Sequence, residues 1–120
     1  MVDQLDLIVS DVVASAEFLR DAVGMQLEVS SETFAQLRTG SLTVMLSREA
    51  LVPVEPARGI ILHVRVEDVS DALARARRHG ADILIERRVT DWGWELAMIQ
   101  GPDAILIDFY RISSPQEQSQ

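Results

Sequence analysis

The sequence predicts an α+β protein made of two copies of one unit, each a strand, a helix and three further strands. The first observation is an internal repeat: LDLIVSDVVASAEFLRDAVGMQL and LHVRVEDVSDALARARRHGADIL share a pattern in which Val9 and Asp11 align with Val66 and Asp68. Second, each stretch changes from the alternation typical of a strand to helical spacing. Third, the length of 120 residues fits one compact domain with a modest core.

Each helical stretch is bounded by residues that commonly start and stop helices. An acidic or hydroxyl side chain precedes it, where it can cap the first turn, and a glycine follows it. These residues are Ser10 or Asp11 with Gly24 in the first copy, and Asp68 or Ser70 with Gly80 in the second. The predicted helices therefore span 12–23 and 69–79.

Period-two alternation returns after each helix and predicts the remaining strands. These are 26–30, 33–39 and 42–47 in the first copy, and 82–87, 94–99 and 104–111 in the second. The opening strand of each copy is the alternating run before its helix. Gly101-Pro102-Asp103 has the residue types of a turn and leads into the last strand.

The copies define the expected domain organisation. We expect a single domain over 1–112, with module one at about 3–50, a proline-rich linker at 51–59 and module two at about 60–112. The polar stretch SSPQEQSQ, 113–120, is expected to be a disordered tail.

Composition excludes several classes of function. There are 11 basic and 19 acidic residues, a net charge of −8, so nucleic acid and anionic membranes are unlikely partners. All basic residues are arginine and there is no cysteine, which excludes thiolate nucleophiles, disulfides and Schiff-base lysines. No apolar run approaches the roughly 20 residues of a membrane span, and the N-terminus lacks a basic leader, so we expect a cytoplasmic protein.

Four strands alternate between an apolar face and a chemically different one. Leu7, Val44, Val64 and Ile107 represent the apolar faces, which we assign to the core. The opposite faces carry polar or aromatic side chains that would share one concave surface if the strands come together. They are Gln4, Asp6, His63, Arg65, Asp108 and Tyr110. The alternative is the ordinary solvated face of a sheet.

These motifs together resemble a known family. The segments VSDVVASAEFLRDAVG, HVRVEDVSDALARARRHGADI and WGWELAMIQGPDAILIDFY are similar to the strand–helix junctions and closing hairpin of the vicinal oxygen chelate superfamily. That superfamily includes glyoxalase I, extradiol dioxygenases and bleomycin-resistance proteins, and the resemblance runs from about Gln4 to Arg111. It implies paired βαβββ modules, each forming a curved half-barrel sheet, in a homodimer.

The resemblance also implies where metal ligands would stand. The aligned positions are Gln4, Met45, Ile61 and Asp108. A thioether is a soft ligand and an isoleucine offers no lone pair, so two of the four cannot hold a hard divalent ion. His63 and Asp6 could supply replacements only if the site were rebuilt. We therefore expect no metal and no other cofactor, as in the metal-free, drug-binding branch of the superfamily.

Both tryptophans stand in the segment TDWGWEL. If this segment is a strand, Trp92 and Trp94 project to the same side, with Gly93 between them. Two indoles on one side of a cleft form a stacking platform for a flat ligand, and we favour Trp92 for this role. Phe34 and Tyr110 are weaker candidates for the same wall. The alternative is that one tryptophan plugs the barrel end or the dimer seam.

We expect a metal-free protein that binds and sequesters a planar aromatic or heteroaromatic ligand, such as an antibiotic. Met45 would add an apolar wall, His63, Arg65, Asp6 and Asp108 would orient the ligand, and the acidic balance favours a cationic or neutral one.

Three alternatives remain at this point. The first is a metal-independent isomerase, cyclase or lyase in which His63 and Asp108 act as catalytic acid and base. The second is a metal-dependent glyoxalase or dioxygenase-type enzyme. The third is a scaffold without a ligand, which a cavity below about 300 Å³ would favour.

Overall fold

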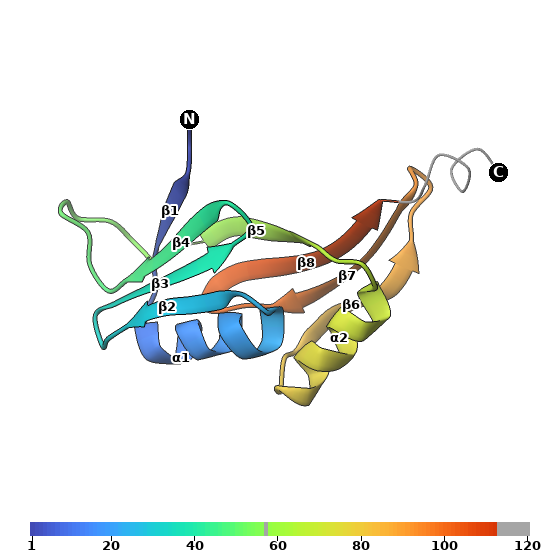
Figure 1. Cartoon of the computed structure of the whole chain (residues 1–120), viewed down its shortest axis with the longest axis horizontal. Helices are drawn as coiled ribbons and strands as arrows, with labels where there is room; N and C mark the ends of the chain where they lie inside the picture. The colour runs from blue at the N-terminus through green and yellow to red at the C-terminus, as the bar shows by residue number, and fades with distance from the viewer. Residues whose placement is uncertain (57, 113–120) are drawn as a thin grey trace.

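The predicted fold class is confirmed by the computed structural model, which describes residues 1–56 and 58–112 (Figure 1). Within these residues the chain forms two βαβββ modules, and each module contributes one four-stranded sheet. The segment 113–120, expected to be a disordered tail, lies outside the described residues. No helix among the described residues is long and apolar enough to cross a membrane.

Module one begins with a strand at the edge of its sheet, and the last strand of the module pairs with it. Its elements are β1 (Gln4–Ile8), α1 (Val12–Phe18), η1 (Leu19–Val23), β2 (Gln26–Ser30), β3 (Phe34–Thr39) and β4 (Leu42–Ser47). The strand order is β1-β4-β3-β2, with β1 parallel to β4 and the remaining pairs antiparallel.

Module two repeats this topology. Its elements are β5 (Arg58–Arg65), α2 (Val69–Arg78), β6 (Ile83–Val89), β7 (Trp94–Gln100) and β8 (Ala104–Ile112). The strand order is β5-β8-β7-β6, and β5 is parallel to β8 just as β1 is to β4. Because β5 begins at Arg58, the last two residues of the predicted linker belong to this strand. The predicted linker was too long because the proline-rich sequence gives no local sign of the pairing of Arg58 with Ala104.

The predicted helix boundaries follow from capping. The carboxylates of Asp11 and Asp68 each accept a backbone N–H from three residues further on, at 3.0 Å, which satisfies a donor at the start of the helix. The first helical stretch changes to the wider π pitch over η1 and stops at Gly24, whose φ of 94° lies in the left-handed region that glycine tolerates.

The core lies between each sheet and its helix, as the alternation predicts. Leu7, Val44, Leu46 and Ile107 are buried on that side, and Phe109 is among the largest fully buried side chains. On β5 the corresponding residues, Leu62 and Val64, are only half-buried. The opposite faces are therefore available to form a site.

The two modules lie side by side along the long axis, with both helices on the lower side in Figure 1. Arg75 of α2 joins them: its guanidinium donates to the carbonyl oxygens of Asp21 at 2.9 Å and Arg20 at 3.3 Å in η1. The backbone N–H of Ser10 also donates to the Asp103 carboxylate, at 3.1 Å, in the β7–β8 turn. These bonds fix one module against the other.

Candidate ligand-binding site

An aspartate–histidine pair stands on the face of the second sheet that α2 leaves uncovered. The parallel register sets His63 of β5 opposite Asp108 of β8, and His63 Nδ1 lies 2.6 Å from Asp108 Oδ2. The Asp108 side chain is 4% exposed, whereas that of His63 is 52% exposed. An ionised carboxylate only accepts hydrogen bonds, so with Asp108 ionised the ring proton lies on Nδ1, and Nε2 is the ring nitrogen that this bond leaves free.

One oxygen of this carboxylate lacks a partner. Asp108 Oδ1 is buried and accepts no hydrogen bond from any described residue. A buried carboxylate with one hydrogen bond has little to offset its lost hydration, so its interaction with His63 is its main compensation. The pair should therefore hold the imidazole firmly in one orientation.

Two aromatic rings stand next to the pair. Trp94 and Tyr110 stack with ring centroids 4.6 Å apart and planes inclined by 17°. The imidazole of His63 meets both rings edge-on, at 6.5 Å from Trp94 and 6.1 Å from Tyr110. Because Trp94 and Tyr110 are half-buried, part of each ring is available to a ligand.

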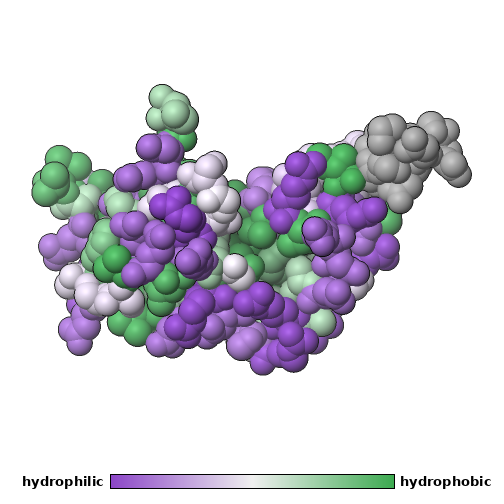
Figure 2. Space-filling view, viewed as in Figure 1, coloured by the Kyte–Doolittle hydropathy of each residue, from purple (hydrophilic) through white to green (hydrophobic). Residues whose placement is uncertain are grey.

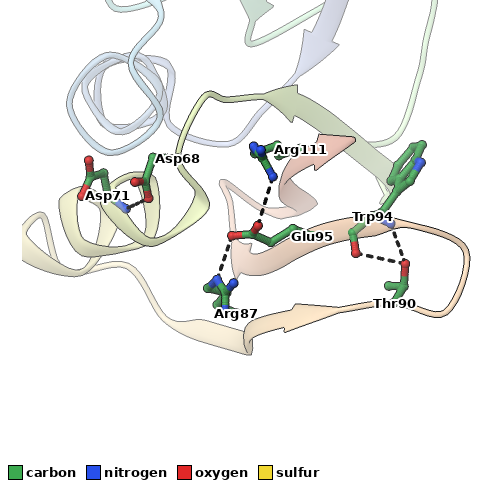
Figure 3. Close-up of polar contacts among 7 residues, drawn as sticks. All are labelled: Asp68, Asp71, Arg87, Thr90, Trp94, Glu95 and Arg111. Atoms are coloured by element: carbon green, nitrogen blue, oxygen red, sulfur yellow. Dashed lines mark hydrogen bonds and ion pairs between the residues drawn. The ribbon is translucent and has the colours of Figure 1, made fainter. Parts of the chain in front are cut away.

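The turn before β7 orients Trp94. The Thr90 hydroxyl accepts the backbone N–H of Trp94 at 3.0 Å and donates to its carbonyl oxygen at 3.1 Å, as Figure 3 shows. The next residue of the strand, Glu95, forms ion pairs with Arg87 at 2.7 Å and with Arg111 at 3.5 Å. Trp94 thus projects from a strand whose start is anchored on both sides.

The predicted placement of Trp92 and Trp94 together on a strand is wrong. β7 begins at Trp94, and Trp92 lies in the turn, 65% exposed. Gly93 has a φ of 90°, which breaks the alternation that would set both indoles on one side. The ring contacts belong to Trp94, and no ring contact of Trp92 occurs within the described residues.

Basic side chains flank the aromatic stack. Arg65 lies opposite Tyr110 in the sheet register, and Arg88 lies opposite Leu96 on the same rung. Both arginines are exposed, and neither forms an ion pair or hydrogen bond with another described residue. This part of an acidic protein therefore offers unpaired positive charge, whereas net charge alone favoured a cationic or neutral ligand.

The remaining predicted site residues lie on the equivalent face of the first sheet. Asp6 stands opposite Met45 and accepts a hydrogen bond from the Ser47 hydroxyl at 2.8 Å. Phe34 lies opposite Ser47, and Gln4 is exposed at the start of β1. In module one, Asp6 and Met45 occupy the positions equivalent to His63 and Asp108 in module two. The first sheet therefore has a carboxylate and a thioether where the second has an imidazole and a carboxylate.

A polar network on this first sheet was missed in the sequence. Glu28 accepts hydrogen bonds from Gln36 at 3.1 Å and Arg38 at 3.2 Å. Those two donors hold the pKa of Glu28 below its ordinary value, with the Gln36 bond the larger cause. The three residues lie on adjacent strands, so only the β2–β3 register brings them together.

A cleft runs along the seam between the modules. Its volume is about 480 Å³, and β5 contributes His63 and Arg65 to its wall. Apolar residues of both modules line most of the rest, which also includes Thr39 and Gly40: they are Leu5, Met25, Leu42, Val44, Ile61, Leu62 and Val64. Figure 2 shows apolar surface in the hollow between the two halves and hydrophilic surface along the side of the helices. His63 therefore borders both the cleft and the aromatic rings.

The comparisons agree with this architecture. The model of the Glyoxalase/Bleomycin resistance protein/Dioxygenase superfamily matches residues 1–109. The chain belongs to this superfamily. No curated protein matches it. A solved structure described as a conserved domain protein is 38% identical, with a TM-score of 0.86, and the match covers 94% of this chain and 99% of that one.

Two further structures of similar fold come from named bacteria. TioX from Micromonospora sp. ML1 is 24% identical with a TM-score of 0.77, over 93% of this chain and 98% of that chain. TnmS3, an antibiotic binding protein from Streptomyces sp. CB03234, is 24% identical with a TM-score of 0.72, over 94% of this chain and 96% of that chain.

The residues at the expected metal positions do not fit a metal centre of the kind known in the glyoxalase superfamily. Asp108 is bonded to His63, Met45 offers only a soft thioether, Ile61 offers no lone pair, and the possible replacement Asp6 is bonded to Ser47. Across residues 1–56 and 58–112, no three His, Cys, Asp or Glu side chains come together as a metal site.

Proposed function

We propose that this member of the glyoxalase superfamily is a metal-free binding protein that sequesters a planar aromatic or heteroaromatic small molecule, such as an antibiotic. The observation that carries the proposal is the half-buried Trp94–Tyr110 stack, with centroids 4.6 Å apart, beside His63 at the edge of the inter-module cleft. A flat ligand can extend this stack, and the cleft can take an apolar substituent.

Two observations support this proposal over a scaffold without a ligand. The cleft volume of about 480 Å³ lies within the range of small-molecule sites, roughly 300–1,000 Å³. TnmS3, which shares the fold, is an antibiotic binding protein. The cleft itself combines apolar side chains with His63 and Arg65, which is the usual mixture of apolar surface with a few polar groups that orient a ligand.

We further propose that the site is completed in a homodimer. Ile61, on the same face of β5 as His63, is 46% exposed, and Leu51 in the segment between the modules is 107% exposed. Figure 2 shows the protruding loop between β4 and β5 as apolar surface. A second copy would cover such surface, as apolar patches at interfaces generally are.

The test is native mass spectrometry of the gently purified protein, alone and after mixing with a panel of planar aromatic antibiotics. We expect a dimer that carries or takes up one such molecule per site. A protein that retains none of them and shows no heat-stability gain with any would contradict the proposal. One metal ion per subunit would instead direct attention to the metal-dependent enzymes of the superfamily.

A second candidate function is supported by the His63–Asp108 pair. A buried carboxylate 2.6 Å from Nδ1 with an exposed opposite ring edge is the arrangement of an oriented general base. We propose as the alternative a metal-independent isomerase, cyclase or lyase that uses this pair. Chromatography and NMR of the recovered ligand, which distinguish isomers of equal mass, test it. A ligand recovered with altered structure, and unaltered from a His63→Ala variant that still binds it, supports catalysis, whereas an unchanged ligand supports sequestration.

A further inference from the structure

The ring orientation of His63 restricts what a ligand can offer it. In a neutral imidazole one ring nitrogen donates and the other accepts. When Nδ1 donates to the ionised Asp108, Nε2 of this half-exposed side chain is an acceptor, and it requires a ligand atom that carries a proton. The His63 plane is inclined by 83° to that of Trp94, so the imidazole does not join the stack and keeps its nitrogen for hydrogen bonding.

The surrounding charges favour a ligand that becomes negative. Arg65 is two residues from His63 on the same face of β5, is exposed, and has no ionic partner among the described residues. The buried carboxylate of Asp108, with one oxygen unpaired within the described part of the chain, would gain from a positive charge on His63. Transfer of a proton from a ligand to Nε2 would place a negative charge on the ligand, near Arg65, and a positive charge on His63, beside Asp108.

We propose that the site recognises hydroxyarenes, flat aromatic rings that carry an acidic hydroxyl group, and that His63 Nε2 accepts the proton of this hydroxyl. This inference rests on the proposed function, because the ring must stack beside Trp94 for its hydroxyl to meet Nε2. On binding, the O–H bond of the ligand breaks, its electron pair stays on oxygen, and an Nε2–H bond forms. The resulting imidazolium lies against the Asp108 carboxylate, the phenolate lies near Arg65, and the proton returns when the ligand leaves.

The experiment compares matched probes that differ only at the hydroxyl. The probes are 7-hydroxycoumarin with coumarin and 7-methoxycoumarin, and 2-naphthol with 2-methoxynaphthalene. Dissociation constants are measured by calorimetry, and the absorbance of 7-hydroxycoumarin reports its phenolate. The buffer pH is set below the range in which the free probe ionises. We expect each hydroxyl probe to bind at least tenfold tighter than its analogues, about 1.4 kcal/mol, and the phenolate band to appear on binding.

Variants assign the effect to one residue. His63→Phe keeps a ring but no acceptor, so the preference for the hydroxyl and the phenolate band should both disappear. His63→Gln offers an amide oxygen that accepts a hydrogen bond but no proton, so part of the preference should return without the band. His79→Phe, at the exposed C-terminal end of α2, is the matched control and should behave as the wild type.

The outcomes separate this inference from the function on which it rests. If hydroxyl and methoxy probes bind equally well and binding needs Trp94, the hydroxyl preference is refuted and the aromatic site stands. If the preference survives in His63→Phe, its assignment to His63 is refuted. If no probe of either kind binds, the proposed aromatic site fails and this inference fails with it.

Discussion

Trp94→Ala should weaken ligand binding far more than Trp92→Ala. Trp94 stacks on Tyr110 at 4.6 Å, and its side chain lies beside His63 at the cleft, whereas Trp92 is 65% exposed in the turn. One aromatic pair with the ligand is worth about 0.5–1.5 kcal/mol, and about 60 Å² of buried indole adds roughly 1.5 kcal/mol. The expected loss of about 2–3 kcal/mol corresponds to a roughly 30- to 150-fold rise in Kd.

Calorimetric titration of the tightest ligand from the antibiotic panel measures this difference. Trp92→Ala removes the same side chain two residues away and is the matched control, with an expected change in Kd of less than about threefold. Trp94→Phe keeps one ring and should fall between the wild type and Trp94→Ala. Circular dichroism checks that each variant is folded. Equal losses for the two alanine variants, or a larger loss for Trp92→Ala, would refute the assignment of the aromatic wall to Trp94.

Three further changes test the framework that holds the site. Gly101→Ala would bring a methyl group 2.8 Å from the carbonyl oxygen of Ile105, so we expect the free energy of unfolding in urea to fall by about 1–3 kcal/mol. An unchanged midpoint would show that the turn can shift to accommodate the methyl group. Arg75→Met removes both hydrogen bonds to η1 and should cost roughly 1 kcal/mol in the same assay, whereas full stability would mean that these two bonds do not help to hold the modules together. Glu28 has a depressed pKa, so its bonds to Arg38 and Gln36 stabilise the fold above its ordinary pKa of 4.5 and are lost as pH falls through the lower, folded-state value. Glu28→Gln should therefore flatten the acid end of the stability profile, and an unaltered profile would exclude this contribution.

The fold was predictable because most of its signals are local. Asp11 and Asp68 cap helices through bonds to residues three positions away, and the alternation of each strand is visible within a few residues. Two features were misjudged, one set by a distant contact and one by the conformation of a local turn. The start of β5 at Arg58 requires pairing with β8, and the position of Trp92 depends on the Thr90 turn and on the backbone conformation of Gly93.

The candidate site was only partly predictable for the same reason. Alternation correctly placed His63 and Asp108 on the face opposite the core, but whether they meet depends on the register of two parallel strands far apart in the sequence. Trp94 and Tyr110 stand on neighbouring strands two register positions apart, and no local pattern indicates that their rings stack. Charge composition could not reveal that Arg65 has no ionic partner among the described residues, because this is a property of the folded surface.

The unequal chemistry of the two modules bears on how such a protein can evolve. After a duplication, the second copy here holds the ionisable pair His63–Asp108, and the first holds Asp6 and Met45 at the equivalent places. Mutations in β1 or β4 can therefore change the wall of the cleft between the modules without altering His63 or Asp108. Under the proposed function, changes in the first half of the gene would alter which ligand fits, while the second half keeps the His63–Asp108 pair.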